Sequence, residues 1–177
     1  MSSQQNCIIC SIIAGNIPSK KVYEDDLILG VIDMNGANPG HCFVMPKNHY
    51  AILEQVPDNE VAKLFQASNK ISRAIFESIG AQGTNIFLAN GIPAGQTVAH
   101  VTVNVIPRKE NDGVNLQWAP KQLSEEEIST VELKLKEQAK NVAIDKPKEK
   151  KEIRQEKPLE LSKEEEDIYE KQLRKIP

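Results

Sequence analysis

The sequence predicts an α+β fold: an antiparallel sheet meander with one long covering helix, plus a C-terminal helical extension. Short segments with strand-like composition, separated by turn residues, predict the meander. Apolar residues at helical spacing between residues 61 and 79 predict the long helix. Capping-box sequences in the charged C-terminal part predict the helices of the extension.

The N-terminal part predicts a helical turn and three strands. Residues 11–18 would form one short turn of helix, ended by glycine and proline. Residues 21–23 and 27–33 predict two strands that form a hairpin across an acidic turn. The next strand should span residues 41–45, and Pro46 should terminate it.

The long helix should begin at Asp58, because aspartate is a favoured N-cap residue. It should end at Gly80, since glycine accepts the left-handed conformation common after a helix. Residues 84–89 predict another strand, and a loop containing glycine and proline leads to the last strand.

The extension differs in kind from the preceding chain, and we divide the sequence into 1–118, 119–145 and 146–177. The first of the two C-terminal segments starts a helix with the capping box Ser124 to Glu127. Its narrow apolar stripe consists of Ile128, Val131, Leu135 and Val142. Residues 146–157 are a charged linker by composition, and a second capping box at 162–165 starts a terminal helix. This terminal helix either docks onto the domain, a second copy or a protein partner, or forms a solvated tail.

Composition excludes several classes of function. The 177-residue chain carries a net charge of −3, which argues against a nucleic-acid partner. Its N-terminus is polar and no apolar run reaches membrane-spanning length. Three cysteines, two of them in Cys7-x-x-Cys10, suit a reducing compartment better than a disulfide framework. We therefore expect a cytoplasmic protein that binds neither nucleic acid nor membrane.

The segment from Gly95 to Arg108 is the most informative part of the chain. At strand period, His100, Thr102 and Asn104 fall on one face. The other face is an apolar row formed by Ala99, Val101, Val103 and Val105. This pattern indicates a strand that buries one side and presents hydrogen-bonding groups to a site on the other.

Cys7 and Cys10 have the two-residue spacing of a zinc knuckle. The chain has three histidines that could complete it: His41, His49 and His100. Two other interpretations are a redox pair, although the usual preceding strand is absent, and two inert core cysteines. Cys42 stands alone on a predicted strand and is expected to be a core residue.

Gly95-Gln96-Thr97-Val98 followed by His100-x-Thr102-x-Asn104 resembles the motif of the histidine triad (HIT) family of nucleotide hydrolases and transferases. The resemblance extends over roughly residues 7–118 and implies a HIT-like fold. In that family three alternating histidines follow the motif. The resemblance implies that the nucleophilic histidine is replaced by Thr102 and the third histidine by Asn104. Because threonine is a poor nucleophile without a neighbouring base, the triad would be degenerate.

The zinc-bearing branch of the family supplies a ligand set by resemblance: Cys7, Cys10, His49 and His100. Two thiolates and two imidazoles fill a tetrahedral zinc ion, so this Zn²⁺ would be structural. His41, which follows Pro39-Gly40, matches a histidine that the family keeps beside its triad.

The resemblance also implies a nucleotide pocket and a homodimer. Asp33 would accept hydrogen bonds from the ribose hydroxyls. The phosphate-side residues would be Asn90, Gln96, Thr97 and Val98, and the residues covering the base would be Ile8, Ile9, Ile12 and Val31.

Two functions follow as hypotheses. In the first, a zinc-stabilised HIT-fold protein has lost nucleotidyl-histidine chemistry and binds a purine nucleotide, or a protein partner through residues 119–177. In the second, it is an active purine nucleotide phosphoramidate or dinucleotide hydrolase, with Thr102, Asn104 and His41 in a variant active site. The first hypothesis needs fewer assumptions.

Overall fold

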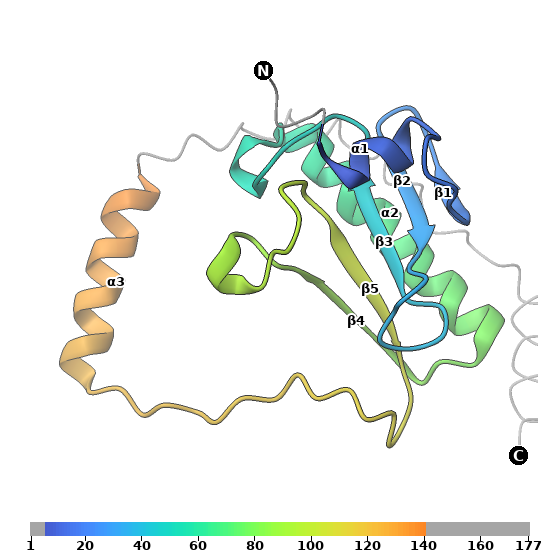
Figure 1. Cartoon of the computed structure of the whole chain (residues 1–177). Coiled ribbons are helices and arrows are strands. Elements are labelled where there is room, and N and C mark those ends of the chain that lie inside the picture. The colour runs from blue at the N-terminus through green and yellow to red at the C-terminus, as the bar shows by residue number, and fades with distance from the viewer. Residues whose placement is uncertain (1–5, 141–177) are drawn as a thin grey trace, which may run out of the picture. The chain divides into compact units, whose positions relative to one another are not determined.

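The computed structural model describes residues 6–140, which divide into two units between Gln122 and Leu123 (Figure 1). The first unit is a five-stranded antiparallel sheet in the order β1-β2-β3-β5-β4. Its strands are β1 (Lys21–Glu24), β2 (Ile28–Ile32), β3 (Cys42–Pro46), β4 (Gly83–Leu88) and β5 (Val103–Arg108). Its helices are α1 (Ile8–Ile13) and α2 (Asp58–Ile79), with 3₁₀ turns at Leu53–Gln55 and Ile92–Ala94. The predicted α+β fold is confirmed.

The long helix α2 covers one face of the sheet (Figure 1). The side chains buried between them are Ile28, Val44, Val103 and Val105 from the strands and Leu64, Ala67, Ile71 and Ile75 from the helix. Helix and sheet approach closely at Gly30, where a Cβ atom would lie 2.7 Å from Ile71 Cδ1. Glycine therefore sets the distance between α2 and β2.

The other face of the sheet carries a second apolar cluster under α1. Cys7 and Ile9 pack there against Leu29, Val31 and Met45. Because successive residues of a strand point to opposite faces, neighbours such as Ile28 and Leu29 enter different clusters. The sheet is thus buried on both sides near β2 and β3.

Both helices of this unit begin differently from the prediction. α1 starts at Ile8 rather than Ser11, so the amide of Ser11 already donates to the Cys7 carbonyl, at 3.1 Å. The N-cap of α2 is Pro57, whose carbonyl accepts from the Glu60 amide at 2.8 Å. Asp58 is the first helical residue instead of the cap. The predicted end is correct, since Gly80 is left-handed with φ +62°.

Two strand limits also differ from the predicted ones. β5 begins at Val103, because the residues before it form a turn in which the His100 amide donates to the Val98 carbonyl at 2.8 Å. Pro46 belongs to β3 and pairs with Ile28. It is the last residue of the strand, a position where proline is tolerated.

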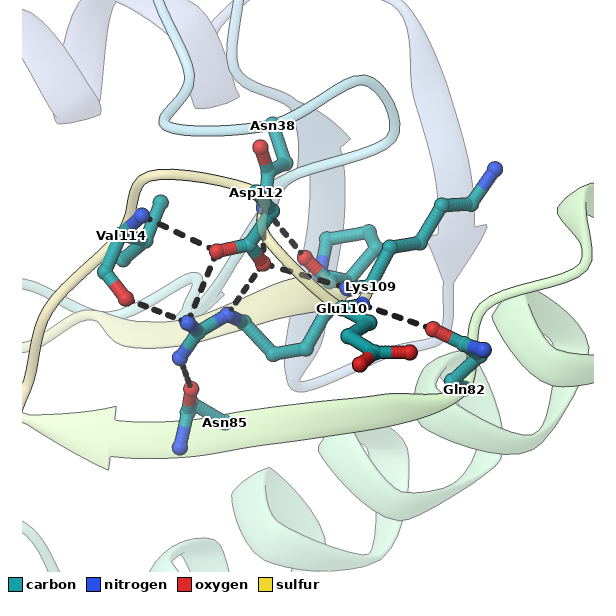
Figure 2. Close-up of polar contacts among 9 residues, drawn as sticks. Asn38, Gln82, Asn85, Lys109, Glu110, Asp112 and Val114 are labelled. Carbon is teal, nitrogen blue, oxygen red and sulfur yellow. Dashed lines mark hydrogen bonds and ion pairs between the residues drawn. The ribbon is translucent and has the colours of Figure 1, made fainter.

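Polar contacts fix the turn that follows β5 (Figure 2). Arg108 Nε and Nη2 donate to the two carboxylate oxygens of Asp112, at 2.6 and 2.9 Å. The same carboxylate accepts from the backbone amides of Lys109 and Val114 and from the side-chain amide of Asn38. One aspartate therefore joins the turn to the loop before β3.

The second unit contains α3 (Glu125–Ala139), which begins with the predicted capping box. The Glu127 amide donates to Ser124 Oγ at 3.2 Å, and the Ser124 amide donates to Glu127 Oε2 at 2.8 Å. Ile128, Val131 and Leu135 are all exposed. Val142, the charged linker and the second capping box lie outside the described residues. Within residues 6–140, no helix has the length and apolar character needed to cross a membrane.

Candidate metal centre and nucleotide pocket

Four side chains from three distant parts of the sequence meet on the α1 face of the sheet. Cys7 and Cys10 come from the start of α1, His49 from the loop after β3, and His100 from the turn before β5. Their ligand atoms all lie within 4.8 Å of one another. Cys10 Sγ is 3.3 Å from His49 Nδ1 and 3.6 Å from His100 Nδ1, and Cys7 Sγ is 3.6 Å from His100 Nδ1.

These spacings suit a tetrahedral ion. With zinc–ligand bonds of about 2.0–2.3 Å, ligand atoms at the corners of a tetrahedron lie about 3.3–3.8 Å apart. Two sulfur and two nitrogen donors are also a set that zinc prefers. The residues of the cluster thus fit zinc both in their chemistry and in the three distances between their ligand atoms.

His100 is oriented for metal binding by the backbone. It is completely buried, and its Nε2 lies 3.0 Å from the Pro46 carbonyl oxygen. A carbonyl can only accept, so Nε2 carries the hydrogen and Nδ1 presents its lone pair to the two sulfurs. Burial, reinforced by the neighbouring His49, lowers the pKa of His100 despite this hydrogen bond. The neutral, metal-binding form is favoured.

The thiols need a cation to become ligands. Burial, together with the neighbouring Cys7, raises the pKa of Cys10 to about 11. A bound divalent ion reverses this preference, because its charge stabilises thiolates. Both cysteines are free thiols.

Cys42 lies away from this site, buried in the apolar cluster under α2, and burial raises its pKa to about 11.

A cavity of about 350 Å³ opens on the same face of the sheet. It is lined by Ile8, Ile9 and Ile12 of α1, by Phe43, Phe87 and Ala89, by Gly95, Gln96, Thr97 and Val98, and by Thr102 and Asn104. Its size lies near the lower end of the roughly 300–1,000 Å³ of small-molecule sites. The walls are mainly apolar, with a few neutral polar groups.

Two aromatic residues of the cavity were missed by the sequence analysis. Phe43 and Phe87 both pair with Asn104, from the strands on either side of β5. Strand registers of β3 and β4 against β5 would have identified them, but the sequence does not supply those registers. They offer the aromatic surface that the aliphatic residues of α1 lack.

His41 connects the cavity wall to the loop before β3. It is buried, its Nδ1 accepts from the Ala37 amide at 3.1 Å, and its Nε2 lies 3.2 Å from Asn104 Oδ1. The Ala37 amide can only donate, so Nε2 carries the hydrogen and donates it to Asn104. Asp33 Oδ2 lies 3.5 Å from Nδ1. Both ring nitrogens of His41 therefore have partners.

Other predicted pocket residues have partners within the protein. Gln96 Oε1 accepts from the Gly91 amide at 2.8 Å, and its Nε2 donates to the carbonyls of Ala51 and Val98. Asn90 accepts from the Leu53 amide at 2.9 Å and donates to Glu54. These two side-chain amides hold loops together. Asp33 Oδ1 accepts from the Asn35 amide, and Val31 is buried in the apolar cluster under α1.

A five-stranded sheet of this order, with a covering helix and a Cys₂His₂ cluster, defines the chain as a HIT-type domain. Residues 14–111 match the family model of the HIT domain. The chain belongs to the HIT family.

Two similar proteins carry the names of enzymes. One is an adenylylsulfatase of Arabidopsis thaliana, to which this chain is 39% identical over 120 residues. The match covers 68% of this chain and 59% of the adenylylsulfatase. The other is an adenosine 5'-monophosphoramidase of Schizosaccharomyces pombe, to which this chain is 33% identical over 127 residues. That match covers 71% of this chain and 92% of the monophosphoramidase.

Solved structures agree with this assignment. A HIT family member from Bacillus subtilis matches with a TM-score of 0.71 and 36% identity, over 78% of this chain and 99% of that one. A zinc-bound histidine triad family protein from Mycobacterium smegmatis matches with a TM-score of 0.61 and 31% identity, over 78% and 99%.

Proposed function

We propose that this protein is a zinc-stabilised HIT protein that binds a purine nucleotide without transferring a nucleotidyl group through a histidine. The observation that carries this proposal is the engagement of its histidines. The chain has three of them. His49 and His100 belong to the cysteine cluster, and His41 has partners at both ring nitrogens.

The proposed loss of chemistry follows from Thr102, which stands where the family resemblance puts the nucleophile. A threonine hydroxyl attacks phosphorus only if a base removes its proton. His41 cannot accept that proton while Nε2 donates to Asn104 and Nδ1 accepts from Ala37. In another hydrolase family, removal of the nucleophile reduces turnover about a million-fold. Binding alone would not restore an enzyme-like rate.

The proposed zinc ion has a structural role. Cys7, Cys10, His49 and His100 would occupy all four tetrahedral positions, which leaves none for substrate. When bound, the ion would cross-link α1 to the two loops that carry the histidines and so stabilise the folded state. The zinc-bound relative from Mycobacterium smegmatis supports zinc as the metal.

The proposed ligand is a purine nucleotide, and the polar groups of the pocket suit its anionic part. Thr97, Thr102 and Asn104 offer neutral hydrogen-bond donors beside the apolar walls. The family resemblance assigns the ribose contact to Asp33. The two similar enzymes are named for adenylyl and adenosine 5'-monophosphate chemistry, which favours adenosine as the nucleoside.

The same proposal includes a homodimer in the cytoplasm. β4 is an edge strand of the sheet. Ile86 of β4 and Phe76 and Ile79 of α2 are exposed apolar residues. A second copy paired along β4 would cover them and continue the sheet. The exposed apolar residues of α3 support a protein partner for the extension.

A hydrolase with a variant site is the second candidate, favoured by the enzymatic activity of the two relatives and by the position of Thr102 in the cavity wall. Turnover of an adenosine phosphoramidate separates the two. We expect wild type and Thr102→Ala to show the same background rate, while both bind AMP by calorimetry. An enzyme-like wild-type rate that Thr102→Ala abolishes would refute the noncatalytic proposal, and absence of AMP binding would refute the nucleotide ligand.

A further inference from the structure

Glu60 is a buried acidic residue in the first turn of α2, with only 7% of its surface exposed. Its Oε1 accepts hydrogen bonds from Asn48 Nδ2 at 3.2 Å and from Tyr50 Oη at 3.1 Å. Within the described part of the chain, its Oε2 is buried without a hydrogen-bond partner. Burial of a carboxylate costs free energy, so a glutamate at this position needs a reason.

The two donors to Glu60 stand on either side of a metal-site histidine. Asn48 and Tyr50 flank His49, whose Nδ1 lies 3.3 Å from Cys10 Sγ. One carboxylate oxygen therefore holds the residue before and the residue after His49. Since α2 is a long helix packed on the sheet, it provides a rigid base for this contact.

The same short segment supports the second histidine. The Pro46 carbonyl accepts from His100 Nε2 at 3.0 Å. The Tyr50 carbonyl accepts from the amide of Val101, the residue after His100, at 2.8 Å. Residues 46–50 are thus the common support of both imidazoles, and Glu60 fastens this segment to α2.

We propose that Glu60 is a positioning residue for the metal centre, which holds residues 48–50 so that His49 stays at ligand distance from Cys10. This inference rests on the proposed zinc site. Without the carboxylate, the segment has to be ordered when the metal binds, and affinity falls by that ordering cost. Outer partners of metal ligands typically contribute about 10–100-fold to affinity. Because Glu60 acts through the backbone, we expect the lower end, about tenfold.

A purely structural Glu60 would affect folding stability and leave metal affinity unchanged. Glu60→Leu removes the acceptor of both hydrogen bonds, so its effect on metal affinity is compared with its separately measured effect on folding stability. Glu60→Gln keeps the oxygen that accepts from Asn48 and Tyr50. Ser72→Ala is the matched control, since Ser72 is equally buried on α2 but bonds Thr84, away from the cluster.

The experiment measures Co²⁺ and Zn²⁺ affinity of the full-length protein by competition with a chromophoric chelator, with the thiolate-to-cobalt absorption as a spectroscopic signature. Unfolding of each metal-free variant is measured in parallel. We expect Glu60→Leu to bind Co²⁺ about tenfold more weakly, with Glu60→Gln and Ser72→Ala close to wild type. Should Glu60→Leu fail to fold, Tyr50→Phe, which removes one of the two donors, provides the comparison and should weaken affinity less.

Three results would overturn this inference. If wild type takes up cobalt but Glu60→Leu binds it as tightly as Ser72→Ala does, the positioning role is wrong and the metal site stands. The same holds if Glu60→Gln is as weak as Glu60→Leu, because the acceptor oxygen would then not be responsible. If wild type takes up neither metal, the zinc proposal and this inference both fail.

Discussion

At the scale of single residues, backbone partners decide what each histidine can do. His41 and His100 both carry their hydrogen on Nε2, but for different reasons. The Ala37 amide occupies Nδ1 of His41, whereas the Pro46 carbonyl occupies Nε2 of His100. His41 is thereby left as a donor to Asn104, and the one lone pair of His100 is directed at the two cysteine sulfurs. Neither has a nitrogen available as a general base.

Asp112 allows a pH-dependent prediction at this scale. The Arg108 guanidinium, followed by the Val114 amide, holds the pKa of this carboxyl well below its ordinary value. A carboxyl with a lowered pKa in the folded state contributes stability above its unfolded pKa, about 3.9. That contribution is lost as pH falls from there through the folded pKa.

Asp112→Asn should therefore destabilise the protein at pH 7, with a difference from wild type that shrinks below about pH 4. Urea unfolding between pH 7 and pH 2.5 measures it. Asp26→Asn, a change in the exposed hairpin turn, is the control. Parallel pH profiles for the two variants would contradict the role given to Asp112.

The sequence predicted which residues gather at the site better than how they are oriented. Cys7-x-x-Cys10 and the two histidines were found from spacing and family resemblance, and they do form one cluster. The side-chain direction of Gln96 depends on the fold of its loop, which local pattern does not encode. Glu60 was missed because an acidic residue in the first turn of a helix is usually solvated.

At the scale of elements, periodicity located the helices and strands, whereas their ends depended on local backbone geometry. α2 was identified from its apolar spacing and from Gly80. The start of β5 was placed too early because residues 99–102 have strand-like alternation but form hydrogen bonds to Val98 and Tyr50 instead of a ladder. In this segment, tertiary contacts prevented the strand that the local sequence pattern predicts.

Gly80→Ala tests the end of α2. Gly80 has φ +62°, and a Cβ atom there would meet nothing within 4 Å. The cost should therefore be backbone strain alone, about 1 kcal/mol of unfolding free energy. Gly83→Ala is the matched control, because Gly83 in β4 has ordinary dihedral angles and its added Cβ would lie 3.8 Å from Arg108 Cβ. Equal unfolding midpoints in urea for the two variants would refute this explanation.

At the scale of the whole molecule, the two faces of the sheet are buried by very different elements. The α2 face is covered by a helix of 22 residues, and the other face by a helix of only six. A six-residue helix is not stable alone, so α1 has to be held by its contacts. The Cys₂His₂ cluster lies where α1 meets the loops that carry His49 and His100, so a metal ion there would fasten the weaker face.

Removal of the metal should therefore loosen one face of the sheet and leave the other intact. We expect about one zinc per chain by elemental analysis, lost in Cys7→Ser and retained in Cys42→Ser, whose cysteine lies under α2. Chelation should lower the melting temperature of wild type by several degrees and leave that of Cys7→Ser unchanged. In hydrogen exchange, amides of α1 should lose protection while those of α2 keep it, because the apolar cluster under α2 includes no residue of the metal site. A metal-free native protein, or equal loss of protection in α1 and α2, would contradict this division of the fold.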